Sequence, residues 1–232
     1  MKKLLLFDVD GTLIKSGSAL TKLHNKSFNY GFKTVYGIDA WTDEMDTIGF
    51  TDKRDIYEIM KLRGLSEREI SSRMDEMFSS MAKYFKDNLS KINADGVLIE
   101  GVKESLSELE KDKGLIIGLL TGNVKGIAEM KLKKLGIWNH FKCGGFGSSS
   151  AIRSELVSEA ISDAKKKRLI GDIELSYVYV IGDTKRDIEC AKEAGAVSVA
   201  VASGEFSKDD LEDHKPDFLI SSLSELVSIL KT

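Results

Sequence analysis

The sequence predicts an α/β protein, with a doubly wound parallel sheet and a second, smaller all-helical domain. Short continuous apolar runs at residues 4–7, 115–120 and 177–181 have the length and composition of strands buried on both faces of a sheet. Segments of helical periodicity separate these runs, and strands that alternate with helices form parallel sheets. Each run also ends in a polar cluster, which is typical of a strand that leaves a sheet at a ligand-binding edge.

The first run is followed by a long stretch with no strand pattern. Residues 15–92 carry apolar side chains at helical spacing, most clearly Ile70, Met74, Met77, Met81 and Phe85. We therefore expect residues 15–92 to form a helical domain, and residues 1–14 together with 93–232 to form the α/β domain. The polar segments at 15–17 and 93–96 would be the hinges between the two.

The rest of the chain alternates between strand and helix. A weaker strand pattern occupies residues 141–146, and further strands are expected at residues 196–201 and 218–220. The expected helices cover residues 102–111, 127–135, 152–168, 187–194 and 223–230. A helix between successive strands of one sheet places those strands parallel to each other.

Composition excludes several classes of protein. With 232 residues, 42% apolar and 31% charged, the chain resembles a soluble globular protein of one large or two small domains. A net charge of −3 gives no reason to expect nucleic acid as a partner. No apolar run approaches the length of a membrane span and no signal peptide is recognisable, so we expect a cytoplasmic protein. The two cysteines are too few for a disulfide framework. For the oligomeric state, the sequence leaves both a monomer and a homodimer open.

Two carboxylates, Asp8 and Asp10, directly follow the first apolar run. Because burying an unpaired carboxylate is costly, both should lie where the strand leaves the sheet. Carboxylates that converge there form a site for a hard cation, with Mg²⁺ as the expected occupant. Asp-Gly after an apolar run also signals a hairpin, but residues 15–18 do not supply the second alternating strand that a hairpin needs.

Polar clusters end the other two strong strands as well. Thr121, Gly122 and Asn123 follow the second, and Asp183 and Asp187 the third. Since the carboxyl ends of parallel strands share one edge, both clusters should meet the carboxylates of the first strand. Thr121 and the N–H of Gly122 would bind an anion at a helix start, although Thr121 could be an ordinary N-cap. Asp183 is the better metal ligand, because Asp187 could equally cap a helix.

In their order along the chain, these motifs resemble those of the haloacid dehalogenase-like (HAD) hydrolase superfamily. They are DxDGT at residues 8–12, strand-Thr-Gly at 115–122, a basic residue, and GDxxxD at 182–187. The helical segment after the first motif is similar to that of the subgroup containing phosphoglycolate phosphatase and β-phosphoglucomutase. The resemblance implies a Rossmann-like core with a helical cap. No dinucleotide-binding or P-loop pattern occurs.

The resemblance also implies catalytic roles. Asp8 would attack phosphorus to give an aspartyl-phosphate, and Asp10 would protonate the leaving oxygen and then activate water. Mg²⁺ would be held by Asp8, Asp183 and the main-chain carbonyl of Asp10, with help from Asp187. These residues are the predicted metal site.

The same resemblance assigns the binding of the phosphoryl group. Thr121 and the N–H of Gly122 would bind its oxygens, and Thr12 and Asn123 are also expected to touch the substrate. The family usually has a lysine beside the nucleophile, and Arg153 stands in its place here. Arginine can bind phosphate in bidentate fashion but is not equivalent to lysine. A solvent-facing Arg153 is the alternative.

Within the helical segment, Gly49-Phe50-Thr51-Asp52 resembles the cap loop that dips toward the substrate in this subgroup. Thr51 and Asp52 are therefore expected to touch the substrate. Either of them could instead be the N-cap of the following helix.

The resemblance favours a Mg²⁺-dependent phosphatase that acts on a small phosphate monoester, such as phosphoglycolate or a sugar phosphate. A phosphomutase of the β-phosphoglucomutase type uses the same motifs and is the nearest alternative. A receiver-like phosphoacceptor signalling domain has a similar cluster of Asp and Thr but no helical insertion of this size. A dehalogenase is disfavoured, because that branch has no use for Asp10.

Overall fold

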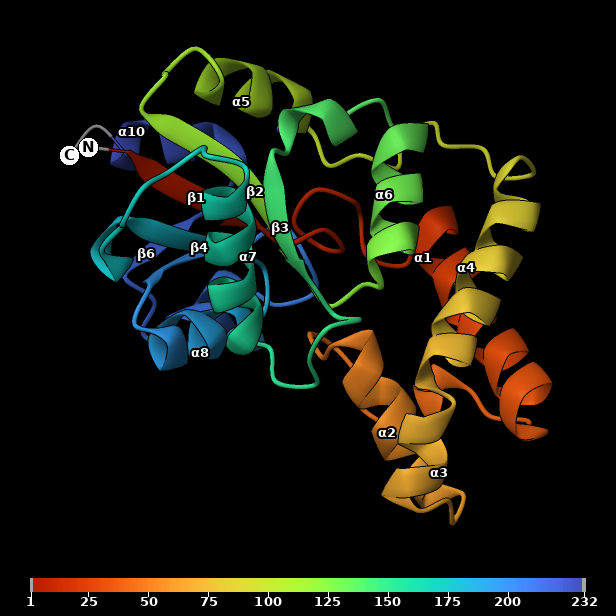
Figure 1. Ribbon diagram of the computed structural model, residues 1–232. Coiled ribbons are helices and arrows are strands. Elements are labelled where there is room, and N and C mark those ends of the chain that lie inside the picture. Colours follow the sequence, from red (N-terminus) through yellow and green to blue (C-terminus); the bar gives the residue numbers. More distant parts are fainter. Residues whose placement is uncertain (1, 231–232) are drawn as a thin grey trace.

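The computed structural model describes residues 2–230, and a six-stranded parallel sheet lies at its centre (Figure 1). The strands are β1 (Lys3–Phe7), β2 (Leu115–Thr121), β3 (Cys143–Phe146), β4 (Val178–Gly182), β5 (Val197–Val201) and β6 (Phe218–Ile220). Their order across the sheet is β3-β2-β1-β4-β5-β6. The direction in which strands are added reverses between β1 and β4, the point where ligands bind in open α/β sheets. The predicted doubly wound parallel sheet is confirmed.

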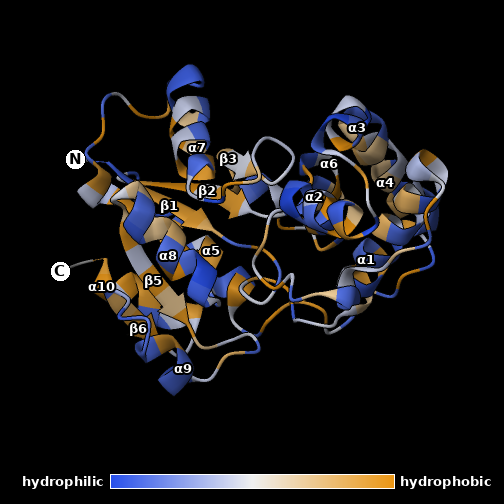
Figure 2. Ribbon diagram, turned by 90° about the horizontal axis from the view of Figure 1, so that it is seen from below, coloured by the Kyte–Doolittle hydropathy of each residue, from blue (hydrophilic) through white to orange (hydrophobic). Residues whose placement is uncertain are grey.

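Helices cover both faces of the sheet because side chains of each strand alternate between the faces. Leu5 and Phe7 of β1 belong to one hydrophobic cluster, and Leu4 and Leu6 to another. The first cluster includes side chains of α5 (Val102–Leu109), α6 (Lys125–Lys134) and α10 (Leu226–Ile229). The second includes side chains of α7 (Glu155–Lys166) and α8 (Lys185–Ala194). Figure 2 shows β1 and β2 as largely hydrophobic strands between helices whose ribbons carry both hydrophilic and hydrophobic residues.

The chain between β1 and α5 is helical, as predicted. Its elements are α1 (Ala19–Gly31), a π-helical turn (Phe32–Tyr36), a 3-10 turn (Thr42–Glu44), α2 (Asp52–Leu62), α3 (Glu67–Ser72) and α4 (Met74–Leu89). Gly31 lets α1 approach α4 closely, since a Cβ there would lie 2.6 Å from the sulfur of Met77. The predicted apolar stripe of α3 and α4 is buried and continues the larger hydrophobic cluster of the sheet.

Two stretches of chain join the helical part to the sheet, and they lie side by side. Ile14 forms an antiparallel bridge with Leu98. The N–H of Lys15 donates to the carbonyl of Val97 at 2.9 Å. The segments predicted as hinges, 15–17 and 93–96, adjoin this pairing.

The structure corrects several predicted boundaries. α7 begins at Glu155, not at residue 152, because the residues before it form turns. A short helix, α9 (Lys208–Glu212), was not predicted, and Ser207 caps it in a capping box with Asp210. Three 3-10 turns complete the chain: Trp138–His140, Leu175–Tyr177 and Leu223–Glu225. Within residues 2–230 no hairpin follows β1, and no helix is long and apolar enough to cross a membrane.

Candidate active site

The first two acidic residues lie where β1 leaves the sheet. The chain turns sharply after Asp8, and the N–H of Ile14 donates back to the carbonyl of Val9 at 2.9 Å. Gly11 has a φ of +91°, a conformation that glycine adopts without strain. A Cβ at Gly11 would lie 2.1 Å from Oδ2 of Asp183. Glycine at this position therefore allows carboxylates from the ends of β1 and β4 to approach each other.

Three buried carboxylates, Asp8, Asp183 and Asp187, each offer an oxygen within 4.8 Å of the others. Burial raises the pKa of Asp8 to about 7, although the Arg153 guanidinium opposes the effect. Burial, with the charges of Asp8 and Asp187, raises the pKa of Asp183 to about 8. A cation would offset this repulsion, and clustered carboxylate oxygens are the donors that Mg²⁺ prefers. The residues thus fit the metal that the resemblance implies.

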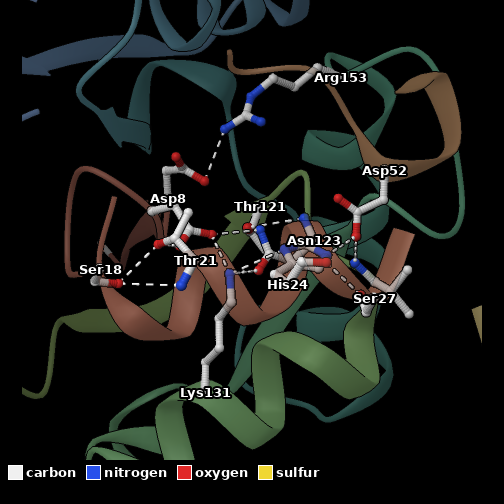
Figure 3. A network of polar contacts seen from close by, with 12 residues as sticks. Asp8, Ser18, Thr21, His24, Ser27, Asp52, Thr121, Asn123, Lys131 and Arg153 are labelled. Carbon is white, nitrogen blue, oxygen red and sulfur yellow. Dashed lines mark hydrogen bonds and ion pairs between the residues drawn. The ribbon is translucent and has the colours of Figure 1, made fainter. Parts of the chain in front are cut away.

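Arg153 lies against two of these carboxylates. Its Nη2 is 3.1 Å from Oδ1 of Asp8 (Figure 3) and 2.6 Å from Oδ1 of Asp187. Its side chain is only 9% exposed, so the solvent-facing alternative is wrong. The other oxygen of Asp187 accepts hydrogen bonds from the N–H and the hydroxyl of Thr184, which caps α8. Asp187 therefore completes the capping box of α8 with Thr184 through one oxygen and holds Arg153 through the other.

Two predicted threonines support other residues of the site. The hydroxyl of Thr12 donates to Oδ1 of Asp183 at 2.9 Å. The hydroxyl of Thr121 accepts the N–H of Asn123 at 3.3 Å. The N-cap of α6 is Val124, so Thr121 is not the ordinary N-cap that the sequence left open.

Asp10 is bound to a buried lysine that the sequence analysis missed, Lys131. The Nζ of Lys131 lies 2.6 Å from Oδ2 of Asp10, 2.7 Å from Oδ1 of Asn123 and 3.3 Å from Nδ1 of His24. Asn123 donates to Oδ2 of Asp10 at 2.9 Å, and the hydroxyl of Thr21 donates to Oδ1 at 3.0 Å. Burial opposes the ionisation of Asp10, but Lys131 lowers its pKa overall.

The sequence did carry a signal for this lysine. Lys131 is four residues from both Ile127 and Leu135, so all three lie on one face of a helix. The structure buries all three, with Lys131 fully inaccessible. A lysine on an apolar face requires a buried partner, which marks it as a residue to examine. His24 has the same spacing among the apolar residues of α1.

The loop before α2 rests on the edge of the sheet. Thr51 is the N-cap of α2, one of the two alternatives left open by the sequence. Asp52 donates its N–H to the carbonyl of Gly122 at 2.8 Å. Its Oδ2 accepts the N–H of Val124 at 2.6 Å and Nε2–H of His24 at 2.9 Å. Asp52 thus joins the helical part to the site through its backbone and its side chain.

A cavity of about 270 Å³ lies between this loop, α1 and the sheet edge. Its lining includes seven predicted site residues: Asp8, Asp10, Asp52, Gly122, Asn123, Arg153 and Asp183. Thr12, Thr51, Thr121 and Asp187 lie outside the lining. The remaining walls include Lys22, Phe28, Ile48, Phe50, Asp55 and Glu205. A cavity of this size accommodates a small molecule.

Comparisons with known proteins match most or all of this chain. A family model described as "Haloacid dehalogenase-like hydrolase" matches residues 5–201. A phosphoglycolate phosphatase from Vibrio parahaemolyticus is 26% identical over 233 residues, covering 98% of this chain and 96% of that protein. The pyrophosphatase PpaX of Bacillus cereus is 25% identical over 226 residues, covering 97% and 95%. A solved structure of β-phosphoglucomutase from Clostridium difficile shares the fold, with a TM-score of 0.70, 18% identity, and coverage of 100% and 96%.

Proposed function

The chain belongs to the haloacid dehalogenase-like hydrolase family, and from this premise we propose that it is a Mg²⁺-dependent phosphatase of small phosphate monoesters, with Asp8 as the nucleophile. The predicted enzyme class, a phosphatase of this family, is confirmed at the level of the family. The proposal concerns the residues that act, the metal, and the size of the substrate.

One observation carries the proposal. The cavity wall carries two carboxylates, each with its own cation: Asp8 lies beside Arg153, which also lines the cavity, and Asp10 is bound to the buried Lys131. A nucleophile needs a cation nearby to receive a phosphate ester, because two anions otherwise repel each other. The second carboxylate is placed to handle protons.

In the first step, an oxygen of Asp8 forms a bond to phosphorus and the bond to the leaving oxygen breaks. Arg153 and the N–H of Gly122 bind the phosphoryl oxygens. Asp10 passes a proton to the leaving oxygen. Because Lys131 lowers the pKa of Asp10, the carboxylate must first take up this proton from solvent, and the negative charge of an arriving ester favours that uptake.

In the second step, water attacks phosphorus, its proton passes to Asp10, and the bond from Asp8 to phosphorus breaks to release phosphate. Asp8, Asp183 and the main-chain carbonyl of Asp10 would hold Mg²⁺, with Asp187 behind them. When bound, Mg²⁺ supplies positive charge that neutralises the phosphoryl oxygens. The helical segment 15–92 would act as a cap that excludes water from the site, with hinges at 15–17 and 93–96.

The size of the cavity supports a small substrate, and the relatives suggest candidates. Those compared above are named for phosphoglycolate and pyrophosphate. Phosphoglycolate, pyrophosphate and a set of sugar phosphates therefore form the first panel. Of the two predicted cap residues, Asp52 lines the cavity and is the candidate for substrate choice, whereas Thr51 caps α2 outside the lining.

The test is phosphate release from this panel, with Mg²⁺ and with a chelator, using Asp8→Asn as the blank. We expect Mg²⁺-dependent release by the wild type, none by the variant, and acid-stable phosphate on the wild-type protein after rapid quenching. Release that persists in Asp8→Asn would contradict the proposal. A sugar bisphosphate that forms in place of free phosphate would identify a phosphomutase.

A further inference from the structure

Lys131 is a buried charge on the sheet side of α6, and its burial needs an explanation. Its side chain has no exposed surface. Removing an ammonium group from water costs several kcal/mol, and only well-placed charges and hydrogen-bond acceptors offset this cost. Interaction with the helix dipole does not explain the burial. Lys133 and Lys134 also lie in the last turn of α6, and both can interact with the dipole while they remain exposed to solvent. The reason must lie in what the ammonium contacts.

All three N–H donors of this ammonium have an acceptor. They are Oδ2 of Asp10, Oδ1 of Asn123 and Nδ1 of His24. Because Nδ1 of His24 accepts, the ring carries its hydrogen on Nε2, which donates to Oδ2 of Asp52 at 2.9 Å. Polar contacts therefore run without a break from Asp10 through Lys131 and His24 to Asp52 at the start of α2, and Figure 3 labels the last three of these residues.

The partners come from both parts of the molecule. Lys131 and Asn123 belong to the α/β part, whereas His24 and Asp52 belong to the helical segment. Asp52 is tied to the sheet edge by the N–H of Val124 at 2.6 Å. The position of the Asp10 carboxylate is therefore linked to whether the helical segment is seated on the sheet.

We propose that Lys131 is a positioning residue, which fixes the Asp10 carboxylate for proton transfer and is itself braced by His24 and Asp52. The inference rests on the proposed function and adds to it a residue outside the family's motifs. Loss of Lys131 should slow the step that needs Asp10 most, the attack of water on the phosphorylated Asp8. The first step should survive with an ester whose leaving oxygen departs without a proton.

The experiment uses p-nitrophenyl phosphate, which has such a leaving group, and compares Lys131→Met with Lys134→Met on the exposed face of the same helix. For Lys131→Met we expect a rapid burst of p-nitrophenol close to the enzyme concentration, then a steady-state rate about 10²-fold below the control. Phosphate should accumulate on Asp8 in the steady state. Lys134→Met should behave as the wild type.

Equal reductions of burst and steady-state rates would mean a purely structural role, and unchanged rates would mean no role; either result overturns the inference alone. A wild type that releases nothing from any ester overturns the proposed function and this inference together. If Lys131→Met does not fold, His24→Phe replaces it, because a phenyl ring fits beside Phe28 and Phe85 and lacks both nitrogens. His24→Phe should keep the burst, and its steady-state rate should be about tenfold below that of the wild type. A ratio of burst to steady-state rate equal to that of the wild type would contradict the support of Lys131 by His24.

Discussion

A methyl group at Gly122 tests whether the loop of residues 49–53 must rest on the sheet edge for catalysis. A Cβ at Gly122 would lie 2.1 Å from the carbonyl oxygen of Phe50, whereas an ordinary contact begins at 3.4 Å. The obstacle is backbone, which cannot rotate away as a side chain can. The loop must therefore move by about 1.3 Å, the difference between these two distances, or more.

Such a movement would break contacts that hold the site together. The N–H of Asp52 would lose the carbonyl of Gly122, now at 2.8 Å, and the carbonyl of Gly49 would move away from Nη1 of Arg153, now at 3.3 Å. A misplacement of about 1 Å can cost about 10²-fold in rate. We therefore expect Gly122→Ala to lower kcat/KM for the best ester of the panel about 10²-fold.

Gly126→Ala is the matched control, four residues further along. A Cβ there meets only the Cβ of Ala82, at 3.9 Å. Because Gly126 lies in the first turn of α6, alanine should stabilise the helix by up to about 1 kcal/mol and leave activity unchanged. Phosphate release and thermal unfolding are measured for both variants. Activity of Gly122→Ala within about threefold of the control would refute the requirement for a seated loop.

The remaining predictions concern charge. Arg153→Met should lower kcat about 10²-fold or more. Arg153→Lys should recover part of the loss, because one ammonium can replace one of the guanidinium contacts to Asp8 and Asp187. Equal kcat values for the two variants would contradict a role for the charge. Mg²⁺ should raise the Tm of the wild type but not that of Asp183→Asn, which lacks one of the three clustered carboxylates. Without metal, the Tm of Asp183→Asn should be higher than that of the wild type, because the variant has less repulsion within the cluster. Differential scanning fluorimetry measures both effects. Burial and the charge of Asp52 raise the pKa of Asp55 well above its usual value, while Arg186 and Arg54 oppose this and Asp46 adds to it. The folded protein then holds a proton that the unfolded chain releases above about pH 4. The free energy of unfolding of the wild type should therefore fall relative to that of Asp55→Asn as pH rises, by at most about 1.4 kcal/mol per pH unit. If urea unfolding gives the same difference in free energy between the two proteins from pH 5 to pH 8, the raised pKa is refuted.

The sheet and the carboxylate cluster were predictable because both follow from local patterns and one topological rule. Apolar runs identify buried strands, and alternation with helices makes those strands parallel. Parallel strands end at one edge, so Asp8 and Asp183 had to meet although most of the chain separates them. None of this depends on the details of side-chain packing.

The surroundings of Asp10 could not be predicted in this way. Its partners come from α1 and α6 and from the loop before α6, and the packing of those elements on each other is not set by local sequence. The spacing of Lys131 indicates burial but cannot identify a partner. The capping role of Thr51 was undecided for a related reason, because a hydroxyl at a helix start can cap or bind and only the fold determines which.

The way the loop of residues 49–53 is seated explains why the motifs identify the family and leave the substrate open. Three of its contacts with the sheet edge use its backbone: the carbonyl of Gly49 accepts from Arg153, and the N–H groups of Asp52 and Lys53 donate to Gly122 and Gly147. Backbone groups are present whatever the side chains are, so these contacts constrain the loop sequence weakly. Loop residues that line the cavity, such as Phe50, can then change with the substrate while the backbone contacts to the motif residues are kept.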